Sequence, residues 1–372
     1  MAGLHPEGIS WDASATAGGE AGGTDIGRRR FLAAAGSSLL VLASGDLCRG
    51  ERNGKPRRAP TAWGYDLRCL DHLKGVRHPE LPGRVKAIAD GLYSNPDFGR
   101  LHILPVRIAT DNELRLVHPK KYIDLVTRES TAGADRLSTG DTTLSGGSLL
   151  AARCAAGSVL AGVDAVARGK VRGAFCAVRP PGHHASAERG MGFCLFNNAA
   201  LAARYAQTRH KLAKVLIIDW DVHHGNGTQD IFYEDDTVLF FSVHQSPWYP
   251  GTGSADETGK GHGKGLTINC PLKAGAGRKE VLAAFETKLV PAADRFEPDL
   301  VVISAGFDSR KDDPLGRFTL DDADFADLTA LVRRIAKKHS GGRVVSVLEG
   351  GYNLKGLASA TEAHVEALMS PL

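Results

Sequence analysis

The sequence predicts an α/β fold in which a parallel sheet is covered by helices on both faces. Short apolar runs rich in β-branched residues alternate with longer segments of helical periodicity, and each run stops at glycine, proline or polar residues. This alternation is typical of parallel sheets, because a chain that returns to a parallel strand needs a crossover helix. The roughly 320 residues beyond position 45 suit one large domain.

Five predicted strands and five predicted helices make up the clearest part of this pattern. The strands cover residues 174–178, 215–217, 238–243, 300–304 and 344–348, and the helices cover 148–168, 197–210, 278–295, 322–339 and 355–369. In chain order, the strands lead to His183-His184, to Asp219 and its neighbours, to His244, to Asp308 and to Glu349-Gly350-Gly351-Tyr352. Because the carboxyl ends of parallel strands meet at one edge of a sheet, we expect these loops to form one pocket.

The segment 218–227, Ile-Asp-Trp-Asp-Val-His-His-Gly-Asn-Gly, is the most informative part of the chain. Asp219, Asp221 and His223 share strand parity, so their side chains can point to the same side. Burying several ionisable groups without partners is costly, and packing alone does not call for them at a strand end. A carboxylate and an imidazole two residues apart can bind one divalent metal ion, so the segment predicts a functional site.

These motifs, taken together, resemble the zinc-dependent histone deacetylase and acetylpolyamine amidohydrolase superfamily. The resemblance covers residues 60–370, and the motifs stand in family order: RPPGHHA, GFCLFNN, DWDVHHGNGTQ, YPGTG, SAGFD with DPLG, and LEGGY. The LEGGY form and Asn226 are similar to the class II and bacterial branch. The resemblance implies a single-domain arginase/deacetylase-like fold with a central parallel sheet of about eight strands.

The resemblance also implies a zinc site held by Asp221, His223 and Asp313. Two carboxylates and one imidazole leave an open coordination position for water, as catalytic zinc sites do. Asp308 and Asp312 stand close by, and the proline after Asp313 together with its spacing from Asp308 favours Asp313 as the ligand. A potassium ion beside the zinc is implied by the same comparison, with ligands from Asp219, Asp221, His223, Ser242 and the carbonyl of Val243.

The implied catalytic residues are the tandem histidines and a tyrosine. The family pairs His183 with Asp219 and His184 with Asn226, so that the first imidazole is held charged and the second stays closer to neutral. Hydrolysis of an amide needs a group that removes a proton from water and one that protonates the amine, which suits histidine. The hydroxyl of Tyr352 corresponds to the group that binds the substrate carbonyl and then the oxyanion.

Four further residues are implied to contact substrate. Phe193 and Tyr249 resemble the two aromatic walls of an acyl-lysine tunnel, and flat rings suit an aliphatic stem. Gly192 corresponds to the residue whose carbonyl accepts the scissile amide N–H. Polyamine-selective eukaryotic relatives carry a gatekeeping glutamate in the loop after the third zinc ligand, and Leu320 stands there by spacing from Asp313. A leucine argues against a preference for polyamines.

Two alternatives to a zinc amidohydrolase remain open at this point. A binuclear manganese ureohydrolase of the same fold needs carboxylates that bridge two metals, but Asn226 stands where a further aspartate is expected. A protein that binds acyl amines without turnover is the other alternative. The complete set of ligands, tandem histidines and Tyr352 argues against it.

The N-terminal region predicts export through the twin-arginine pathway. Arg28, Arg29 and Arg30 precede Phe31-Leu32 and an apolar run of small residues up to Gly45, which is too short for the ~20 residues of a membrane span. We therefore expect a signal over residues 1–45, a disordered linker over 46–60 and a catalytic domain over 61–372. A fortuitous basic cluster in a cytoplasmic protein is the alternative.

The partners follow from the same features. The implied substrate is a small-molecule or peptide acyl amine, and the export machinery would contact the signal. No stable membrane insertion is expected after the signal is removed. The formal net charge is +4, which is too mild to predict nucleic-acid binding. The sequence leaves the oligomeric state open.

Overall fold

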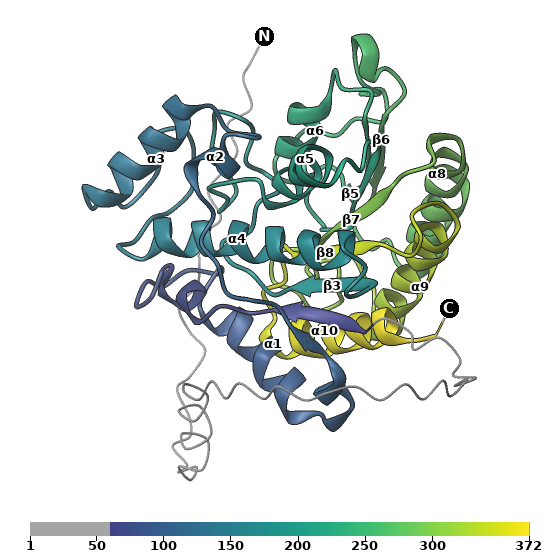
Figure 1. Cartoon of the computed structure of the whole chain (residues 1–372), viewed down its shortest axis with the longest axis horizontal. Coiled ribbons are helices and arrows are strands. Elements are labelled where there is room, and N and C mark those ends of the chain that lie inside the picture. The colour runs from purple at the N-terminus through teal and green to yellow at the C-terminus, as the bar shows by residue number, and fades with distance from the viewer. Residues whose placement is uncertain (1–59, 372) are drawn as a thin grey trace, which may run out of the picture. The chain divides into compact units, whose positions relative to one another are not determined.

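The computed structural model describes residues 60–371 and shows one eight-stranded sheet flanked by helices (Figure 1). The strands stand in the order β2-β1-β3-β8-β7-β4-β5-β6, and every neighbouring pair is parallel. Their bounds are β1 Thr61–Gly64, β2 His102–Ile103, β3 Gly173–Cys176, β4 Val215–Asp219, β5 Val238–Gln245, β6 Thr267–Leu272, β7 Leu300–Ala305 and β8 Val344–Leu348. The expected parallel α/β sheet of about eight strands is therefore confirmed.

Helices cover both faces of the sheet. The α-helices are α1 Gly83–Ser94, α2 Asp111–Leu114, α3 Lys120–Thr131, α4 Ser148–Ala167, α5 Asn198–His210, α6 Asn226–Phe232, α7 Arg278–Ala284, α8 Val290–Phe296, α9 Asp322–His339 and α10 Leu354–Met369. Short 3-10 helices occur at Leu67–Asp71, Pro96–Arg100 and Gly261–Gly263. Helices α1, α9 and α10 share one apolar core with the sheet, and α4 and α5 share the core on the opposite face (Figure 1).

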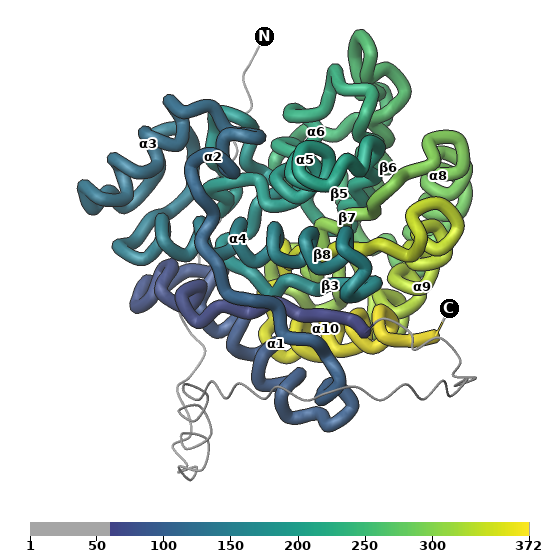
Figure 2. The backbone as a smooth tube through the Cα atoms, in the orientation of Figure 1, coloured from purple at the N-terminus to yellow at the C-terminus, as the bar shows by residue number. Residues whose placement is uncertain are grey.

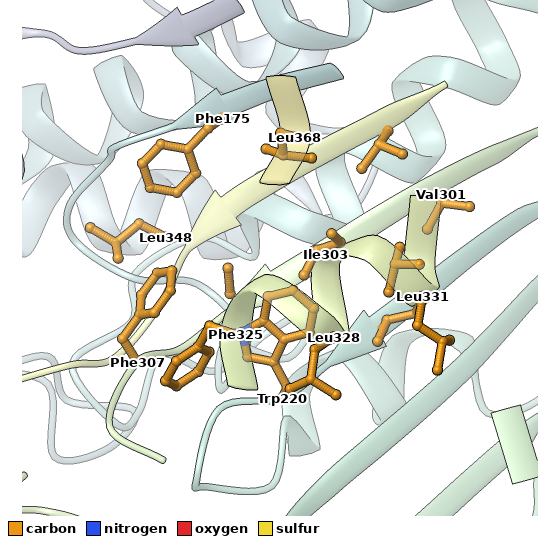
Figure 3. Close-up of a cluster of buried hydrophobic side chains, with 14 of the residues drawn as sticks. Phe175, Trp220, Val301, Ile303, Phe307, Phe325, Leu328, Leu331, Leu348 and Leu368 are labelled. Carbon is orange, nitrogen blue, oxygen red and sulfur yellow. The ribbon is translucent and has the colours of Figure 1, made fainter. Parts of the chain in front are cut away.

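The alternation of side chains along the strands builds these two cores. Leu216 and Ile218 of β4 face the first core, whereas Val215 and Ile217 face the second. Figure 3 shows Trp220 among Ile303, Phe325 and Leu328 in the first core. The segment that follows β4 is therefore anchored by a fully buried indole between two aspartates.

The strand order of the sheet brings segments that are distant in sequence side by side. Strand β3 lies beside β8 although about half of the domain separates them in sequence (Figure 2). In the middle of the sheet, Asp219 is level with Ser242 of β5 and Ser304 of β7. The loops after these strands therefore begin at the same height.

One local difference from the expected elements has a clear cause. The predicted helix over 278–295 is interrupted by a π-helical turn at Phe285–Leu289, just before Pro291. Proline has no backbone N–H to donate to the preceding turn, so a regular α-helix cannot continue through that point. Helix α4 is long and apolar enough to pass a length-and-composition test for a membrane span. Because 78% of that window is buried inside the fold, it matches a core helix equally well.

The expected signal over residues 1–45 and nearly all of the expected linker lie outside the described residues. Of the domain expected over 61–372, the structure describes every residue except the last, and the division of the chain remains a prediction. Export and the signal remain predictions.

Candidate active site

Five loops at the carboxyl ends of β3, β4, β5, β7 and β8 bring ionisable and aromatic side chains together. The loop after β3 carries His183 and His184, and their ring centroids lie 4.0 Å apart. The segment after β4 supplies Asp221, His223 and Asn226, and each of these residues is at most 9% exposed. This is the edge of an open parallel sheet at which ligands are generally bound.

The tandem histidines have different hydrogen-bond partners. His183 Nδ1 lies 2.9 Å from Asp219 Oδ2, and His184 Nδ1 lies 2.8 Å from Asn226 Oδ1. Burial alone would lower the pKa of His183, but the charges of Asp219 and Asp221 outweigh it and raise the pKa to about 10. Burial and the neighbouring charge of His183 hold the pKa of His184 well below its usual value. The structure therefore places one charged and one neutral imidazole side by side, in the pairs that the sequence predicts.

Three side chains converge on one point suited to a metal ion. Ligand atoms of Asp221, His223 and Asp308 lie within 4.8 Å of one another, and all three residues are buried. His223 Nδ1 is 2.9 Å from Asp221 Oδ1 and 3.1 Å from Asp308 Oδ2. Burial followed by the charge of Asp221 raises the pKa of Asp308 to about 7. Two carboxylates and an imidazole that share one focus fit zinc, because a cation would relieve the repulsion between the carboxylates.

The backbone comes very close to these carboxylates at Gly350. A Cβ atom at this position would lie 2.0 Å from Asp308 Oδ2 and 2.6 Å from Asp221 Oδ2. Its own N–H donates to Asp221 Oδ2 at 2.8 Å. Only glycine fits here, so Gly350 is explained by its close approach to these two carboxylates.

The third ligand differs from the sequence expectation. Within residues 60–371, the three-ligand group contains Asp308 and not Asp313. Asp313 Oδ2 accepts hydrogen bonds from the backbone N–H groups of Tyr352 and Asn353 at 2.7 and 3.1 Å, and Oδ1 accepts one from Leu315 at 2.9 Å. Asp308 follows the end of β7 by three residues and stays at the sheet edge, whereas Asp313 lies beyond a turn. The assignment of Asp313 as a ligand is therefore corrected to Asp308, and Asp313 holds the Tyr352 loop.

Tyr352 lies beside the same carboxylates. Its ring is partly exposed and packs edge-on against Phe193, with centroids 6.1 Å apart, while the Arg84 guanidinium lies 4.8 Å from its ring centroid. Burial raises the pKa of the Tyr352 hydroxyl well above its usual value. Arg84 opposes this, and the charges of Asp308 and Asp221 add to it. The hydroxyl therefore stays protonated and can act as a hydrogen-bond donor.

Of the two expected aromatic walls, Tyr249 packs beside His184 and Phe193 packs beside Tyr352. The Tyr249 ring is 5.1 Å from that of His184 and 6.2 Å from that of His223, whereas Phe193 lies 4.5 Å from His78. Gly192 precedes Phe193 with φ of +56°, and a Cβ atom there would lie 2.2 Å from the His184 ring. A side chain at this position would displace the histidine, so the close approach requires glycine.

Asp141 connects these walls, and the sequence did not single it out. Its Oδ1 accepts the Gly192 N–H at 2.7 Å, and its Oδ2 accepts the Tyr249 hydroxyl at 2.9 Å. The Gly192 carbonyl, the expected acceptor for substrate, receives the Cys194 thiol at 3.3 Å. No motif surrounds Asp141, so only its contacts identify it.

Leu320 does not lie where the sequence expectation requires. It is 1% exposed and belongs to the apolar core that the sheet shares with α1, α9 and α10, so its assignment to substrate binding is wrong. The error follows from counting seven residues from Asp313. The same spacing counted from Asp308 leads to Leu315, which is partly buried and whose carbonyl accepts the Trp248 indole N–H at 2.9 Å. The position remains a leucine.

The expected potassium ligands are close to one another, but their role remains a prediction. Asp219 and Ser242 are register partners on neighbouring strands. The Ser242 hydroxyl lies 2.9 Å from His244 Nδ1, and Asp219 Oδ1 accepts the Asp221 N–H at 3.1 Å. Val243, which lies between Ser242 and His244 in the sequence, is buried in the apolar core.

Comparison with known protein families identifies the family of this chain. A model of the histone deacetylase domain matches residues 78–368, which include the tandem histidines, the three-ligand cluster and Tyr352. The chain belongs to the histone deacetylase family. The crystal structure of the HDA15 HD domain superposes on this deacetylase-family chain with a TM-score of 0.79 at 41% identity, over 84% of this chain and 90% of that one.

Curated relatives of this histone deacetylase family member come from plants, bacteria and animals. Histone deacetylase 15 of Arabidopsis thaliana is 41% identical over 318 residues, which are 83% of this chain and 56% of the relative. The histone deacetylase-like amidohydrolase of Pseudomonas aeruginosa is 41% identical over 316 residues, or 79% of this chain and 82% of the relative. Polyamine deacetylase HDAC10 of Homo sapiens is 40% identical over 305 residues, or 78% and 44%. The chain thus spans about half the length of some relatives and most of the bacterial one.

Proposed function

We propose that this protein is a zinc-dependent amidohydrolase that removes acetyl or longer acyl groups from an amine. The observation that carries the proposal is the convergence of Asp221, His223 and Asp308 beside the paired histidines. The family match and the names of the relatives, which include an amidohydrolase and two deacetylases, support the same reaction class. The described residues form one three-ligand group, which favours a single metal over a binuclear manganese centre.

The side chains have separate tasks in this reaction. A bound zinc ion would polarise the acyl carbonyl and lower the pKa of water at the site. His184 is neutral, so its Nε2 can accept the proton of the attacking water and return it to the leaving amine. His183 is charged through Asp219 and stabilises the negative charge that develops nearby. The Tyr352 hydroxyl donates to the carbonyl oxygen as that oxygen gains charge.

The walls of the site favour an aliphatic, uncharged stem next to the reacting amide. The Tyr249 ring lies beside His184 and the Phe193 ring lies beside Tyr352, so both aromatics adjoin residues of the proposed reaction. Leu315 places no negative charge in the loop after Asp308, so this chain lacks the glutamate expected of a polyamine-selective relative. We therefore propose acyl-lysine or a similar acylated amine as the substrate class, in preference to acetylpolyamines.

The test compares turnover of an acetyl-lysine peptide, an acetylpolyamine and a longer acyl-lysine peptide by the purified protein. The metal is first removed with a chelator and then restored with zinc or with manganese. We expect turnover of the acyl-lysine substrates, its loss on chelation and its recovery with one equivalent of zinc. Activity that needs two manganese ions, or none with any acyl amine, would refute the proposal.

Export through the twin-arginine pathway is a second proposal, independent of the chemistry. It rests on Arg28, Arg29 and the apolar run that follows them. Twin-arginine export carries folded proteins, which suits a metal site that is assembled before translocation.

A further inference from the structure

A fully buried cluster of charged side chains lies beneath the loops that carry the tandem histidines and Tyr352. Within residues 60–371, none of its hydrogen bonds is made to the proposed metal ligands. Glu80, Arg84 and Arg179 are each 0% exposed. The Glu80 carboxylate accepts from both guanidinium groups: Oε1 lies 3.0 Å from Arg84 Nη1 and 2.8 Å from Arg179 Nε, and Oε2 lies 2.6 Å from Arg179 Nη2. One negative charge is therefore shared between two buried positive charges.

One arm of this cluster holds the loop of the tandem histidines. Arg179 lies four residues before His183, at the point where the chain leaves β3. Its guanidinium also donates to the carbonyls of Cys69 and His72 at 2.7 and 2.8 Å, and to the carbonyl of Glu80 at 2.9 Å. These bonds leave the Arg179 side chain a single geometry, because every donor direction of the planar fork is used.

The second arm holds the loop of Tyr352. Arg84, in the first turn of α1, donates to the carbonyl of Gly351 at 2.6 Å and to the carbonyl of Glu349. Its guanidinium also lies over the Tyr352 ring. The Glu349 side chain in turn accepts the N–H of His183 at 3.1 Å, so this loop and the histidine loop are in contact.

Glu80 carries the negative charge that compensates both buried arginines of this cluster. Burial alone would raise the pKa of Glu80, but the charge of Arg179, its hydrogen bond and the charge of Arg84 outweigh burial and hold the pKa down to about 2. His72, whose Nε2 lies 3.4 Å from Glu80 Oε2, has a pKa lowered to about 4 by burial and is neutral near pH 7. Without the carboxylate, two buried guanidinium groups would face each other uncompensated, and such groups reorganise or draw in water.

We propose that Glu80 is a positioning residue that fixes the Tyr352 loop relative to the histidine loop by neutralising the two arginines that hold them. The effect on catalysis rests on the proposed function, because it acts through the hydroxyl of Tyr352. The effect on the loops does not depend on that function. Glu80 itself touches no reacting atom.

The kinetic test is a double-mutant cycle between Glu80→Gln and Tyr352→Phe. We expect Glu80→Gln alone to lower kcat at least about tenfold while KM changes less than about threefold, since the lost oxyanion donor is worth ~10²–10³. In the Tyr352→Phe background the same substitution should lower kcat by a clearly smaller factor, because the part of its effect that acts through the hydroxyl has already been lost. The matched control is Asp66→Asn, which removes another buried carboxylate that pairs with an arginine, Arg68, outside both loops. Any cost of that control should be equal in both backgrounds.

A second measurement does not depend on turnover. Hydrogen exchange of peptides covering residues 179–184 and 349–353 should become at least about tenfold faster in Glu80→Gln and stay unchanged in Asp66→Asn. If Glu80→Gln does not fold, Glu80→Asp, which keeps the charge but shortens its reach, is measured in both experiments. Equal kinetic costs in both backgrounds, or unchanged exchange in both segments, would overturn the proposal. If the parent protein hydrolyses no acyl amine, the proposed function fails and exchange alone decides the role of Glu80.

Discussion

Replacing Asp308 and Asp313 separately by asparagine distinguishes a metal ligand from a residue that holds a loop. Each substitution keeps the size of the side chain and one oxygen acceptor. Asp308→Asn should remove the metal and the activity, because Asp308 contributes one of three converging ligands. Asp313→Asn should retain the metal, because both oxygens of Asp313 bind backbone N–H groups.

The two variants should also differ in stability once the metal has been removed. The pKa of Asp308 is raised from 3.8 to about 7, so above pH 7 its ionised form is less favourable in the folded than in the unfolded chain. About three pH units at 1.36 kcal/mol each make this cost about 4 kcal/mol. Asparagine avoids the cost, so metal-free Asp308→Asn should be more stable at pH 8 by as much as ~4 kcal/mol, less the attraction to His223 that is lost.

Asp313→Asn should be less stable than Asp308→Asn. Burial raises the pKa of Asp313 as well, so asparagine avoids a charge cost there too, but its single oxygen leaves at least one of the three backbone N–H groups facing an amide nitrogen, at a cost of about 1.5 kcal/mol. The assays are metal content per chain by mass spectrometry and urea unfolding at pH 8 with a chelator. Metal loss in Asp313→Asn together with full occupancy in Asp308→Asn would show that the sequence-based choice of Asp313 was right and the structural assignment wrong.

Three further predictions concern chemistry, pH and compartment. Tyr352→Phe should lower kcat by ~10²–10³ with unchanged zinc content, and a loss of less than about threefold would leave Tyr352 a packing residue. Burial lowers the pKa of His364 to about 3, so between pH 6.5 and 3 the unfolded chain binds a proton that the folded chain does not. Stability should therefore fall on acidification, by about 2 kcal/mol from this group at pH 5, and the urea midpoint of His364→Gln should depend less steeply on pH than that of the parent. A fusion of residues 1–60 to a folded reporter should be exported by the twin-arginine route, and changing Arg28 and Arg29 to lysine should abolish export. Export that is unaffected by the lysine pair would contradict the signal.

The central strands were predictable from sequence because they are buried on both faces. Strands β4, β5, β7 and β8 have every residue buried and read as largely apolar runs, interrupted by single serines and by the polar ends of β4 and β5. The outer strands were not predicted, since β2 has only two residues, both exposed, and β6 is only partly buried and contains Pro271. Edge strands lack the burial that leaves a hydrophobic pattern in the sequence.

The sequence by itself determined which loops carry the chemistry. Each predicted strand ends in a polar motif, and because side chains along a strand alternate with a period of two, local order was enough to place Asp219, Asp221 and His223 on one side. The pairing of His183 with Asp219 and of His184 with Asn226 was implied by the family resemblance, and the structure contains both contacts.

Only the tertiary structure decided the third ligand and the contacts between loops. Asp308 and Asp313 are five residues apart, and the turn that separates them does not follow from spacing. Asp141 meets Tyr249 across 108 residues, and Glu80 meets Arg179 across 99 residues. Such contacts depend on how strands and helices pack together, and one aspartate in a loop has no local pattern from which its distant partner could be inferred.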